Sequence, residues 1–353
     1  MNSKKPFISL FIAILVFTAC DPVEKPEEMH INKGAYVLNQ GSFKKNNAGI
    51  TYYDFATGFA SNDIFLDKNN RSLGDTGQDM IAYGSKLYVA MYSSKVVEVL
   101  DKKTAKSIKT ITITNNNATS APRALAAAMG KVYVTLYDGY VAQIDTVTLN
   151  VEKSVKVGSN PEGIAITNNK IFVANSGGMQ AIMDSTISVI NMATFTEIKK
   201  IKVNLNPGVI QADSYGDLYV LTKGNYFNIP AQLQHINTAT DKVTDIDMKA
   251  QYMDIVGDKA YVVNFEYAPD WSVTNKTVGI YDVKNEKIIS NNILKSEIAK
   301  TPFSINVDPS TNLIYVGETD FVTNGKMYCF DENGTLKYSF TTGVNPAKVL
   351  FVK

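Results

Sequence analysis

The heptapeptide KLYVAMY at residues 86–92 recurs almost unchanged as KVYVTLY at residues 131–137. Each contains an aromatic residue followed by valine inside an apolar run. The same pair occurs in seven such runs, at Tyr36, Tyr88, Tyr133, Phe172, Tyr219, Tyr261 and Tyr315. Successive pairs are 39 to 54 residues apart. A repeat of about 40–50 residues without a helical pattern is typical of a β-propeller.

A turn signal follows each aromatic–valine run at a similar place. A further apolar run ends in Asp or Asn, at Asp54, Asp101, Asp145, Asn191, Asn237, Asp282 and Asp331. The side chain of either residue can accept a hydrogen bond from the backbone two residues on, which fixes a tight turn. Apolar segments that start with proline, at Pro122, Pro161, Pro207 and Pro302, precede several of the runs. Each repeat therefore predicts four strands.

Both faces of the repeated strand are apolar. In KLYVAMY, Leu87 and Val89 point to one face and Tyr88 and Ala90 to the other, so the strand is covered on both sides. Seven sheets closed into a ring cover every such strand. We predict an all-β fold for residues 34–353: a seven-bladed β-propeller with four antiparallel strands per blade.

The two ends of this region complement each other. The first repeat starts with GAYVLN at residues 34–39 and lacks a leading strand, whereas NPAKVLFVK at residues 345–353 is a leading strand without a repeat after it. We predict that Val349 to Val352 pair with Tyr36 to Leu38 and close the ring.

The first residues have the pattern of an export signal. Lys4 and Lys5 precede an apolar run at residues 7–17, which is too short to span a bilayer. Cys20 directly follows FTA, which resembles a bacterial lipobox, so we expect residues 1–19 to be a lipoprotein signal peptide and Cys20 to be acylated. An ordinary signal peptide with an unrelated cysteine is the alternative. Residues 20–33 are charged and contain proline, which indicates a flexible tether.

Composition argues against several classes of function. The net charge is +1 and there are only two histidines and two cysteines, so nothing indicates a nucleic-acid partner or a metal centre. The sequence contains no HExxH, GxSxG or glycine-rich phosphate loop. We therefore expect no enzymatic activity, no catalytic residue and no cofactor. Cys329 is expected to be a small buried residue.

The candidate binding residues lie on one predicted face of the ring. The distance from each aromatic–valine pair to its Asp or Asn varies from 12 to 21 residues, and we expect the loop between second and third strands to absorb this variation. Variable loops on a rigid ring commonly carry specificity, and clustered aromatic residues indicate binding. The loop candidates are Tyr92, Tyr137, Tyr226, Phe227, Phe265, Tyr267, Trp271 and Phe321. Candidates expected on links or loops of the same face are Gln78, Asp79, Arg123, Asn175 and Tyr252. The alternative is that several aromatics pack against neighbouring loops and only stiffen the rim.

The lipobox, the acidic tether, YVLNQGSF at residues 36–43, NNAGITYYD at residues 46–54 and the seven repeats resemble a family of propeller lipoproteins of gut bacteria, described as YncE-like, BtuG-like or surface-layer-like. The resemblance covers nearly the whole chain after Cys20. It implies a lipid-anchored, surface-exposed protein of the outer membrane that captures cobalamin or another corrinoid and passes it to a TonB-dependent transporter. A surface propeller that binds protein or glycan, as a scaffold or adhesin, and a propeller hydrolase or lyase are the alternatives.

Overall fold

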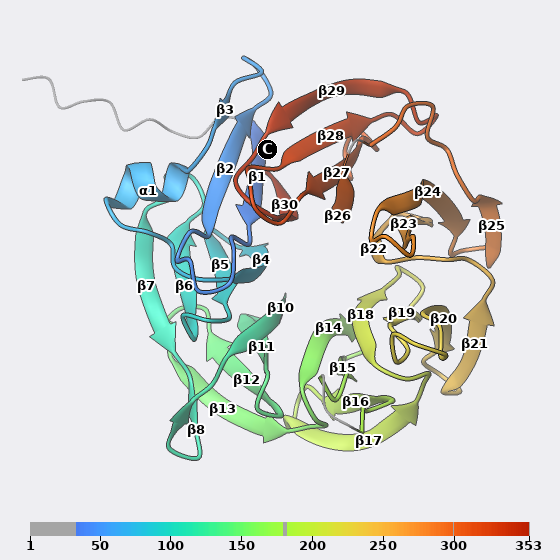
Figure 1. Ribbon diagram of the computed structural model, residues 1–353. Coiled ribbons are helices and arrows are strands. Elements are labelled where there is room, and N and C mark those ends of the chain that lie inside the picture. Colours follow the sequence, from blue (N-terminus) through green and yellow to red (C-terminus); the bar gives the residue numbers. More distant parts are fainter. Residues whose placement is uncertain (1–32, 179–181, 299, 353) are drawn as a thin grey trace, which may run out of the picture.

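The computed structural model describes residues 33–178, 182–298 and 300–352, and it confirms the predicted fold. Seven four-stranded antiparallel sheets surround a central opening (Figure 1). The predicted signal peptide, Cys20 and the tether up to residue 32 lie outside the described residues. Among the residues described, no helix has both the length and the apolarity needed to cross a bilayer.

The blades follow one another along the chain. Blade 1 contains β1 (Gly34–Asn39), β2 (Gly49–Asp54), β3 (Ala60–Ser61) and the last strand, β30 (Pro346–Val352). Blade 2 contains β4 (Gly77–Tyr83), β5 (Lys86–Met91), β6 (Val96–Asp101) and β7 (Ser107–Thr112). Blade 3 contains β10 (Pro122–Ala128), β11 (Lys131–Leu136), β12 (Tyr140–Asp145) and β13 (Val151–Lys156). Blade 4 contains β14 (Pro161–Thr167), β15 (Lys170–Asn175), β16 (Thr186–Asn191) and β17 (Thr196–Lys202).

The remaining blades have the same order. Blade 5 contains β18 (Pro207–Ala212), β19 (Leu218–Thr222), β20 (Gln232–Asn237) and β21 (Lys242–Ile246). Blade 6 contains β22 (Tyr252–Val256), β23 (Lys259–Tyr267), β24 (Val273–Asp282) and β25 (Lys287–Ser290). Blade 7 contains β26 (Thr301–Val307), β27 (Ile314–Thr319), β28 (Lys326–Phe330) and β29 (Leu336–Thr341). In each of blades 2 to 7 the first strand is innermost (Figure 1).

The core lies between neighbouring blades. Tyr36 of blade 1 shares a buried cluster with Met80 and Leu87 of blade 2. Tyr88, on the opposite face of β5, packs in the next cluster with Val132 of blade 3. Each second strand therefore buries both of its faces, as its two-sided apolar pattern predicted. Cys329 in β28 is also buried, as expected.

The turns after the third strands are confirmed. Asp101 Oδ1 accepts a hydrogen bond from the Lys103 backbone N–H at 2.9 Å, and Asp145 and Asn191 accept equivalent bonds from residues two positions on. At Asn237 the backbone donor is Thr240, three residues on. We call the side of the ring that carries these turns the Asx face.

The predicted closure of the ring is also confirmed. β30 pairs antiparallel with β1, so that Val349 lies opposite Val37 and Leu350 opposite Tyr36. The seam is also bonded to blade 7, because Asn306 Oδ1 accepts from the Val349 N–H at 2.9 Å. The last strand is thus paired within blade 1 and bonded to blade 7, which closes the ring.

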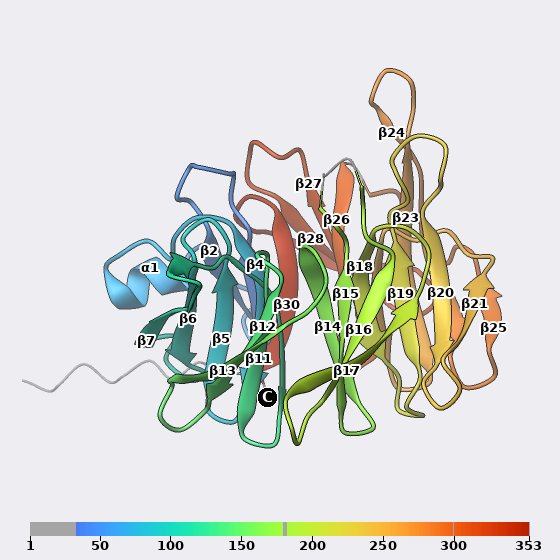
Figure 2. The same ribbon diagram turned by 90° about the horizontal axis from the view of Figure 1, so that it is seen from below.

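The opposite side of the ring carries the loops between second and third strands and the links between blades, and we call it the loop face. Figure 2 shows these loops rising on one side of the molecule, with the β23–β24 hairpin projecting furthest. Gly34 pairs with Val352 at the other side, where the Lys33 carbonyl accepts from the Phe55 N–H. Both ends of the described chain therefore lie on the Asx face.

Three local features differ from expectation. A short helix, α1 (Ile64–Asn69), lies between blades 1 and 2; Asp63 caps it, and Ile64 and Phe65 are buried. A two-residue pairing joins β8 (Thr114–Asn115) and β9 (Ala118–Thr119) in the next link. The expectation that only loops absorb the variable length is wrong in blade 6, where β23 and β24 have 9 and 10 residues.

Candidate ligand-binding site at the channel mouth

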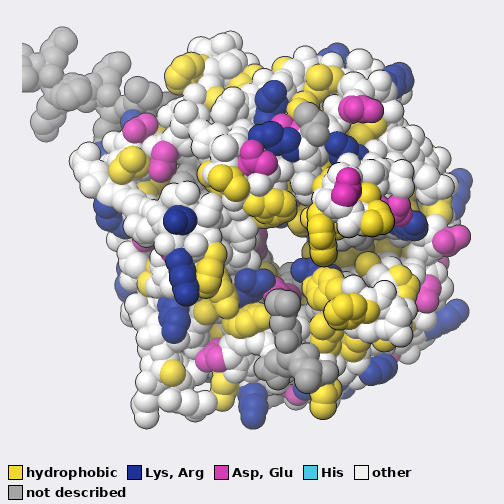
Figure 3. Space-filling view, in the orientation of Figure 1, with side chains coloured by type: hydrophobic (Ala, Val, Ile, Leu, Met, Phe, Trp, Pro, Cys, Tyr) yellow, Lys and Arg dark blue, Asp and Glu magenta, His cyan; other side chains and the backbone are white. Residues whose placement is uncertain are grey.

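The central opening contains a cavity of about 290 Å³. Its wall comes from the innermost strands β4, β10, β14, β18 and β30, and its polar lining residues are Gln78, Asp79, Arg123, Glu162, Gln211 and Lys348. Figure 3, which views the loop face, shows hydrophobic side chains around the opening, most densely beside β18 and β22, and charged side chains inside it beside β10 and β14. The mouth therefore has an apolar side and a polar side.

The polar side is built around Arg123. Its Nε and Nη2 donate to Glu162 Oε2 at 2.8 and 2.5 Å, and both side chains are mostly buried. The guanidinium carbon lies 4.9 Å from the ring centre of Tyr92 and 5.2 Å from that of Tyr137. These two rings meet edge to face, 5.6 Å apart. Because each contact restricts the guanidinium, Arg123 has a fixed orientation at the mouth.

Asp79 is a cavity residue whose carboxylate is already engaged. Its two oxygens accept from the backbone N–H groups of Met80 and Leu125, each at 2.8 Å. Burial raises the pKa of Asp79 above its usual value, although Lys348 and these backbone donors oppose the rise. Asp254 resembles it: burial raises its pKa, and it accepts from the Val307 N–H at 2.8 Å. These carboxylates hold neighbouring blades together.

Aromatic residues of blades 6 and 7 contact one another on the loop face, and we call this group the aromatic wall. Tyr252 at the start of β22 contacts Phe303, whose ring centre is 6.2 Å away, and Phe303 contacts Phe321 at 5.9 Å. Burial raises the pKa of Tyr252 well above its usual value, with a smaller contribution from Tyr267. The wall comprises Tyr252, Phe265, Tyr267, Trp271, Phe303 and Phe321.

Several loop aromatics are highly exposed. The exposed fraction is 94% for Phe227, 79% for Trp271, 60% for Tyr226 and 46% for Phe321. Tyr226, Trp271 and Phe321 also have left-handed backbone conformations, with φ of 63°, 65° and 66°. Bulky residues are rare in this region, although Leu149 and Phe195 also adopt it in turns of the Asx face. The loops of blades 5, 6 and 7 thus share a strained aromatic residue at the rim.

The structure gives the predicted residues different surroundings. It brings Tyr92, Arg123 and Tyr137 together, and it places Gln78 and Asp79 in the cavity wall. Phe265 is buried at the base of the β23–β24 hairpin. Several residues expected on links or loops lie instead in strands. Gln78, Asp79, Arg123 and Tyr252 belong to innermost strands, which extend up to the mouth. Asn175 ends the second strand β15, and Phe265 and Tyr267 belong to the long strand β23.

Asn175 is fully buried at the end of β15. Its Oδ1 accepts from the Gly158 N–H at 3.1 Å, and its Nδ2 donates to Thr186 and Ser188. In this arrangement the side chain joins a link to the blade, and its hydrogen-bonding groups are used internally.

Sequence reasoning missed four residues of the mouth as binding candidates: Glu162, Gln211, Phe303 and Lys348. Two of them share a signal with Arg123. Arg123, Glu162 and Phe303 each directly follow the proline near the start of an innermost strand. That position faces the mouth in three blades, so the proline marks a candidate binding residue. Gln211 and Lys348 carry no such signal.

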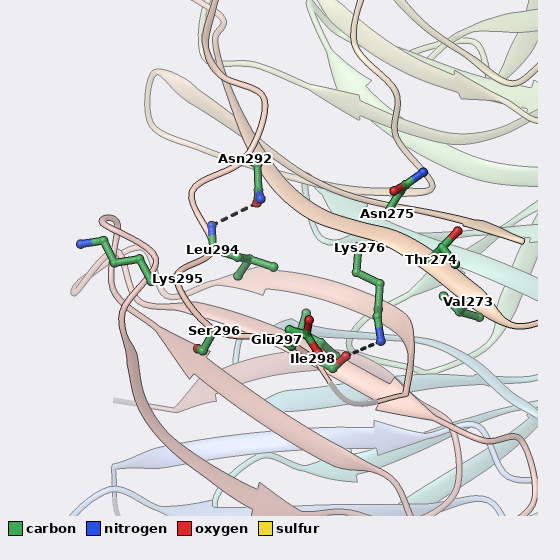
Figure 4. Close-up of a pocket in the computed structure, with 10 residues that line it drawn as sticks. All are labelled: Val273, Thr274, Asn275, Lys276, Asn292, Leu294, Lys295, Ser296, Glu297 and Ile298. Atoms are coloured by element: carbon green, nitrogen blue, oxygen red, sulfur yellow. Dashed lines mark hydrogen bonds between the residues drawn. The ribbon is translucent and has the colours of Figure 1, made fainter. Parts of the chain in front are cut away.

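A second cavity, of about 490 Å³, lies on the loop face between β24 and the link from blade 6 to blade 7. Figure 4 shows its lining, in which Lys276 Nζ donates to the Ile298 carbonyl at 2.5 Å and the Leu294 N–H donates to Asn292 at 3.1 Å. Its lining, as far as the structure describes it, contains no aromatic residue. Among residues 33–178, 182–298 and 300–352, no three His, Cys, Asp or Glu side chains are placed to hold a metal ion.

Comparison with solved structures shows the fold at low sequence identity. A protein of Bacteroides uniformis ATCC 8492, provisionally called a 6-phosphogluconolactonase, has 13% identity and a TM-score of 0.64, with 91% of this chain and 99% of that chain covered. Hydrazine synthase of Kuenenia stuttgartiensis has 18% identity and a TM-score of 0.61, with 75% and 85% covered. The WD40 domain of Neurospora crassa Pan2 has 11% identity and a TM-score of 0.58, with 77% and 80% covered.

Comparison with curated protein sequences gives no match. One protein family matches residues 33–314. This range contains blade 1 without its closing strand β30, blades 2 to 6 complete, and the beginning of blade 7. Its description is a domain of unknown function, DUF5074. Because the match covers most of the chain, the protein belongs to the DUF5074 family.

Proposed function

We propose that the protein is a non-enzymatic capture protein for a wide ligand with an apolar face and polar edges. The observation that carries the proposal is that hydrophobic side chains beside β18 and β22 border the same opening as the Arg123 cluster (Figure 3). Aromatic rings supply contact area with few side-chain torsions to restrict. A preformed site on a rigid ring also avoids much of the ordering that weakens binding.

A corrinoid is the specific ligand we propose. Its ring is broad and partly apolar, and amides surround its edge, which suits an aromatic wall facing polar groups. The resemblance to BtuG-like and YncE-like lipoproteins supports the same ligand, together with a lipid anchor on Cys20 at the outer-membrane surface and transfer to a TonB-dependent transporter. An anchor would raise the effective concentration of the receptor near such a transporter.

Titration with cyanocobalamin by calorimetry, with equilibrium dialysis in parallel, tests the ligand. We expect binding at or below micromolar concentration. Trp271→Ala and Tyr226→Ala should each weaken it by about 1–3 kcal/mol, or about 5- to 150-fold in Kd. Phe59→Ala is the matched control, because Phe59 is an exposed aromatic next to a hairpin of the Asx face. Absence of both heat and retained ligand at micromolar concentration would eliminate the corrinoid.

A protein- or glycan-binding role is the second candidate, favoured by the exposure of Phe227 and Trp271 at the loop tips. Binding on a glycan array or a stable partner in a pull-down, lost in Trp271→Ala, would support it over capture of a small ligand.

A hydrolase is less favoured, because backbone donors engage Asp79 and Arg123 engages Glu162. Hydrolysis of 6-phosphogluconolactone by the purified protein would contradict a non-enzymatic role.

A further inference from the structure

The charges that line the channel cavity balance. Arg123 and Lys348 are its cations, and Asp79 and Glu162 are its carboxylates. Arg123 and Glu162 form a direct ion pair with a shortest distance of 2.5 Å. A ligand group that carries a full charge would lose water on entering this cavity and would meet no net opposite charge in return.

Hydrogen-bonding capacity remains unused beside this ion pair. Arg123 uses Nε and Nη2 on one oxygen of Glu162, whereas a guanidinium has five N–H donors. Within the part of the chain that the structure describes, Arg123 Nη1, Glu162 Oε1 and the Gln78 side-chain amide form no hydrogen bond with the protein, although all three residues line the cavity. The polar side of the mouth therefore offers donors and acceptors together.

Two other polar side chains of the cavity, Asp79 and Gln211, already have hydrogen-bond partners. Both Asp79 oxygens accept backbone N–H groups. Gln211 donates to the Met253 carbonyl at 3.1 Å and accepts from the Ile255 N–H at 2.8 Å. Asp79 and Gln211 connect blades, and Lys348 opposes the burial-driven rise in the pKa of both Asp79 and Asp254. We therefore assign recognition of a ligand to Arg123, Glu162 and Gln78.

We propose that the channel mouth selects a neutral carboxamide group of the ligand, and that Arg123 is the residue that determines this selection. This inference rests on the proposed capture function. A primary amide has a carbonyl acceptor for Arg123 and an N–H₂ donor for Glu162 or Gln78. A carboxylate can only accept and would meet the Glu162 oxygen, whereas an ammonium can only donate and would meet Arg123. Glu162 is a positioning residue that also cancels the charge of Arg123.

Three probes with the same ring and different end groups test the proposal: indole-3-acetamide, indole-3-acetate and tryptamine. In this proposal the indole stacks on an aromatic ring of the mouth, and the end group reaches Arg123 and Glu162. Dissociation constants come from ligand-observed NMR titration of the full propeller at about pH 7, where the three end groups are neutral, negative and positive. We expect the amide to bind at least about threefold more tightly than either charged probe.

Variants at the ion pair make the test specific. Arg123→Met should abolish the preference for the amide, and Arg123→Lys should reduce it because the guanidinium fork is lost. Glu162→Gln leaves the Arg123 charge uncompensated, so it should shift the preference towards indole-3-acetate. Glu332→Gln is the control: it removes the same charge from a turn on the Asx face, where Glu332 pairs with Lys259, and it should leave the order unchanged. Thermal unfolding verifies that each variant is folded.

Four results would overturn the proposal. These are tighter binding of either charged probe by the unaltered protein, no binding of any probe at about 10 mM, an unchanged order in both Arg123 variants, and no shift towards the acetate in Glu162→Gln. Failure of cyanocobalamin to bind would remove the corrinoid and leave the probe order standing. Conversely, failure of the probes would leave a positive cyanocobalamin titration unaffected.

Discussion

Three aromatic residues of the rim adopt a backbone conformation that bulky side chains avoid. For Trp271 and Phe321 the local hydrogen bonds show how it is maintained: the Trp271 N–H donates to the Ala268 carbonyl at 2.9 Å, and the Phe321 N–H donates to Thr319 Oγ1 at 2.8 Å. Such conformations cost of order 1–3 kcal/mol each and persist where surrounding bonds determine them. The loops therefore hold these rings at the rim at the expense of stability.

A pair of substitutions at Trp271 separates backbone strain from ring contacts. Both Trp271→Ala and Trp271→Gly remove the ring, but only glycine relieves the left-handed strain at φ 65°. We expect the glycine variant to be more stable than the alanine variant by about 1 kcal/mol in urea unfolding, with equally weakened ligand binding. Equal stability of the two variants would show that the backbone is not strained.

The buried carboxylates of the channel predict a pH dependence. Burial raises the pKa of both Asp79 and Asp254, so the folded state holds their protons more tightly than the unfolded state. The stability that this contributes is present below the usual pKa of about 4 and is lost as the pH rises through the raised values. Asparagine at both positions stays neutral and keeps one acceptor oxygen. At Asp79 its Nδ2 would face one of the two backbone donors, and this loss is the same at every pH.

We therefore expect the difference in Tm between Asp79→Asn/Asp254→Asn and the unaltered protein to become more positive between about pH 4 and pH 7. Thermal unfolding followed by circular dichroism at both pH values measures it. A difference that stays constant or falls would contradict the raised pKa values.

At the scale of strands and turns, regular features could be predicted from local sequence. The Asp or Asn at each turn bonds to backbone groups only two or three residues away, so the turns at Asp101 and its equivalents could be predicted from local sequence. The extended β23–β24 hairpin could not be predicted from the sequence, because it projects beyond the stacked sheets and few of its side chains are buried. Its strands pair Glu266 with Thr274 and Tyr267 with Val273, and the polar stretch VTNK at residues 273–276 has no apolar alternation.

Closure of the ring yields a prediction for its last strand. Removal of residues 345–353 would expose the edge of β1 and eliminate the bonds that Asn306 and Ser304 make with β30. We expect Tm to fall by many degrees in differential scanning calorimetry, because the hydrophobic cluster around Val349 also opens. A truncated chain that melts like the full one would show that the seam adds no stability.

At the scale of the whole molecule, the ring could be predicted, but the composition of its mouth could not. The seven repeats fix the architecture because every blade must bury the same faces. Which side chains meet around the opening depends on how neighbouring blades pack, as for Arg123 with Glu162 or Tyr252 with Phe303. Patterns in the sequence suggested the loop aromatics and Arg123 as candidates. They left out Glu162 and Phe303, which become neighbours of these residues only when the blades pack together.

The separation of the two faces predicts how an anchor would affect binding. Lys33 leaves the ring at the Asx face, opposite the mouth. If Cys20 is acylated, Cys20→Ser should move the protein from the membrane fraction to the soluble fraction of cells. The soluble protein should bind its ligand with unchanged Kd in equilibrium dialysis. Retention of the Cys20→Ser protein in the membrane fraction would contradict anchoring through this residue.

The pairing of Gly34 with Val352 has a further consequence for engineering. Because these two residues are neighbours in one sheet, a short peptide could join them, and new termini could then be opened in a turn such as residues 284–285 between β24 and β25. Such a circular permutant would keep every strand pairing while moving its ends to another blade. A fluorescent reporter fused to the new termini could therefore be positioned at a chosen blade of the ring.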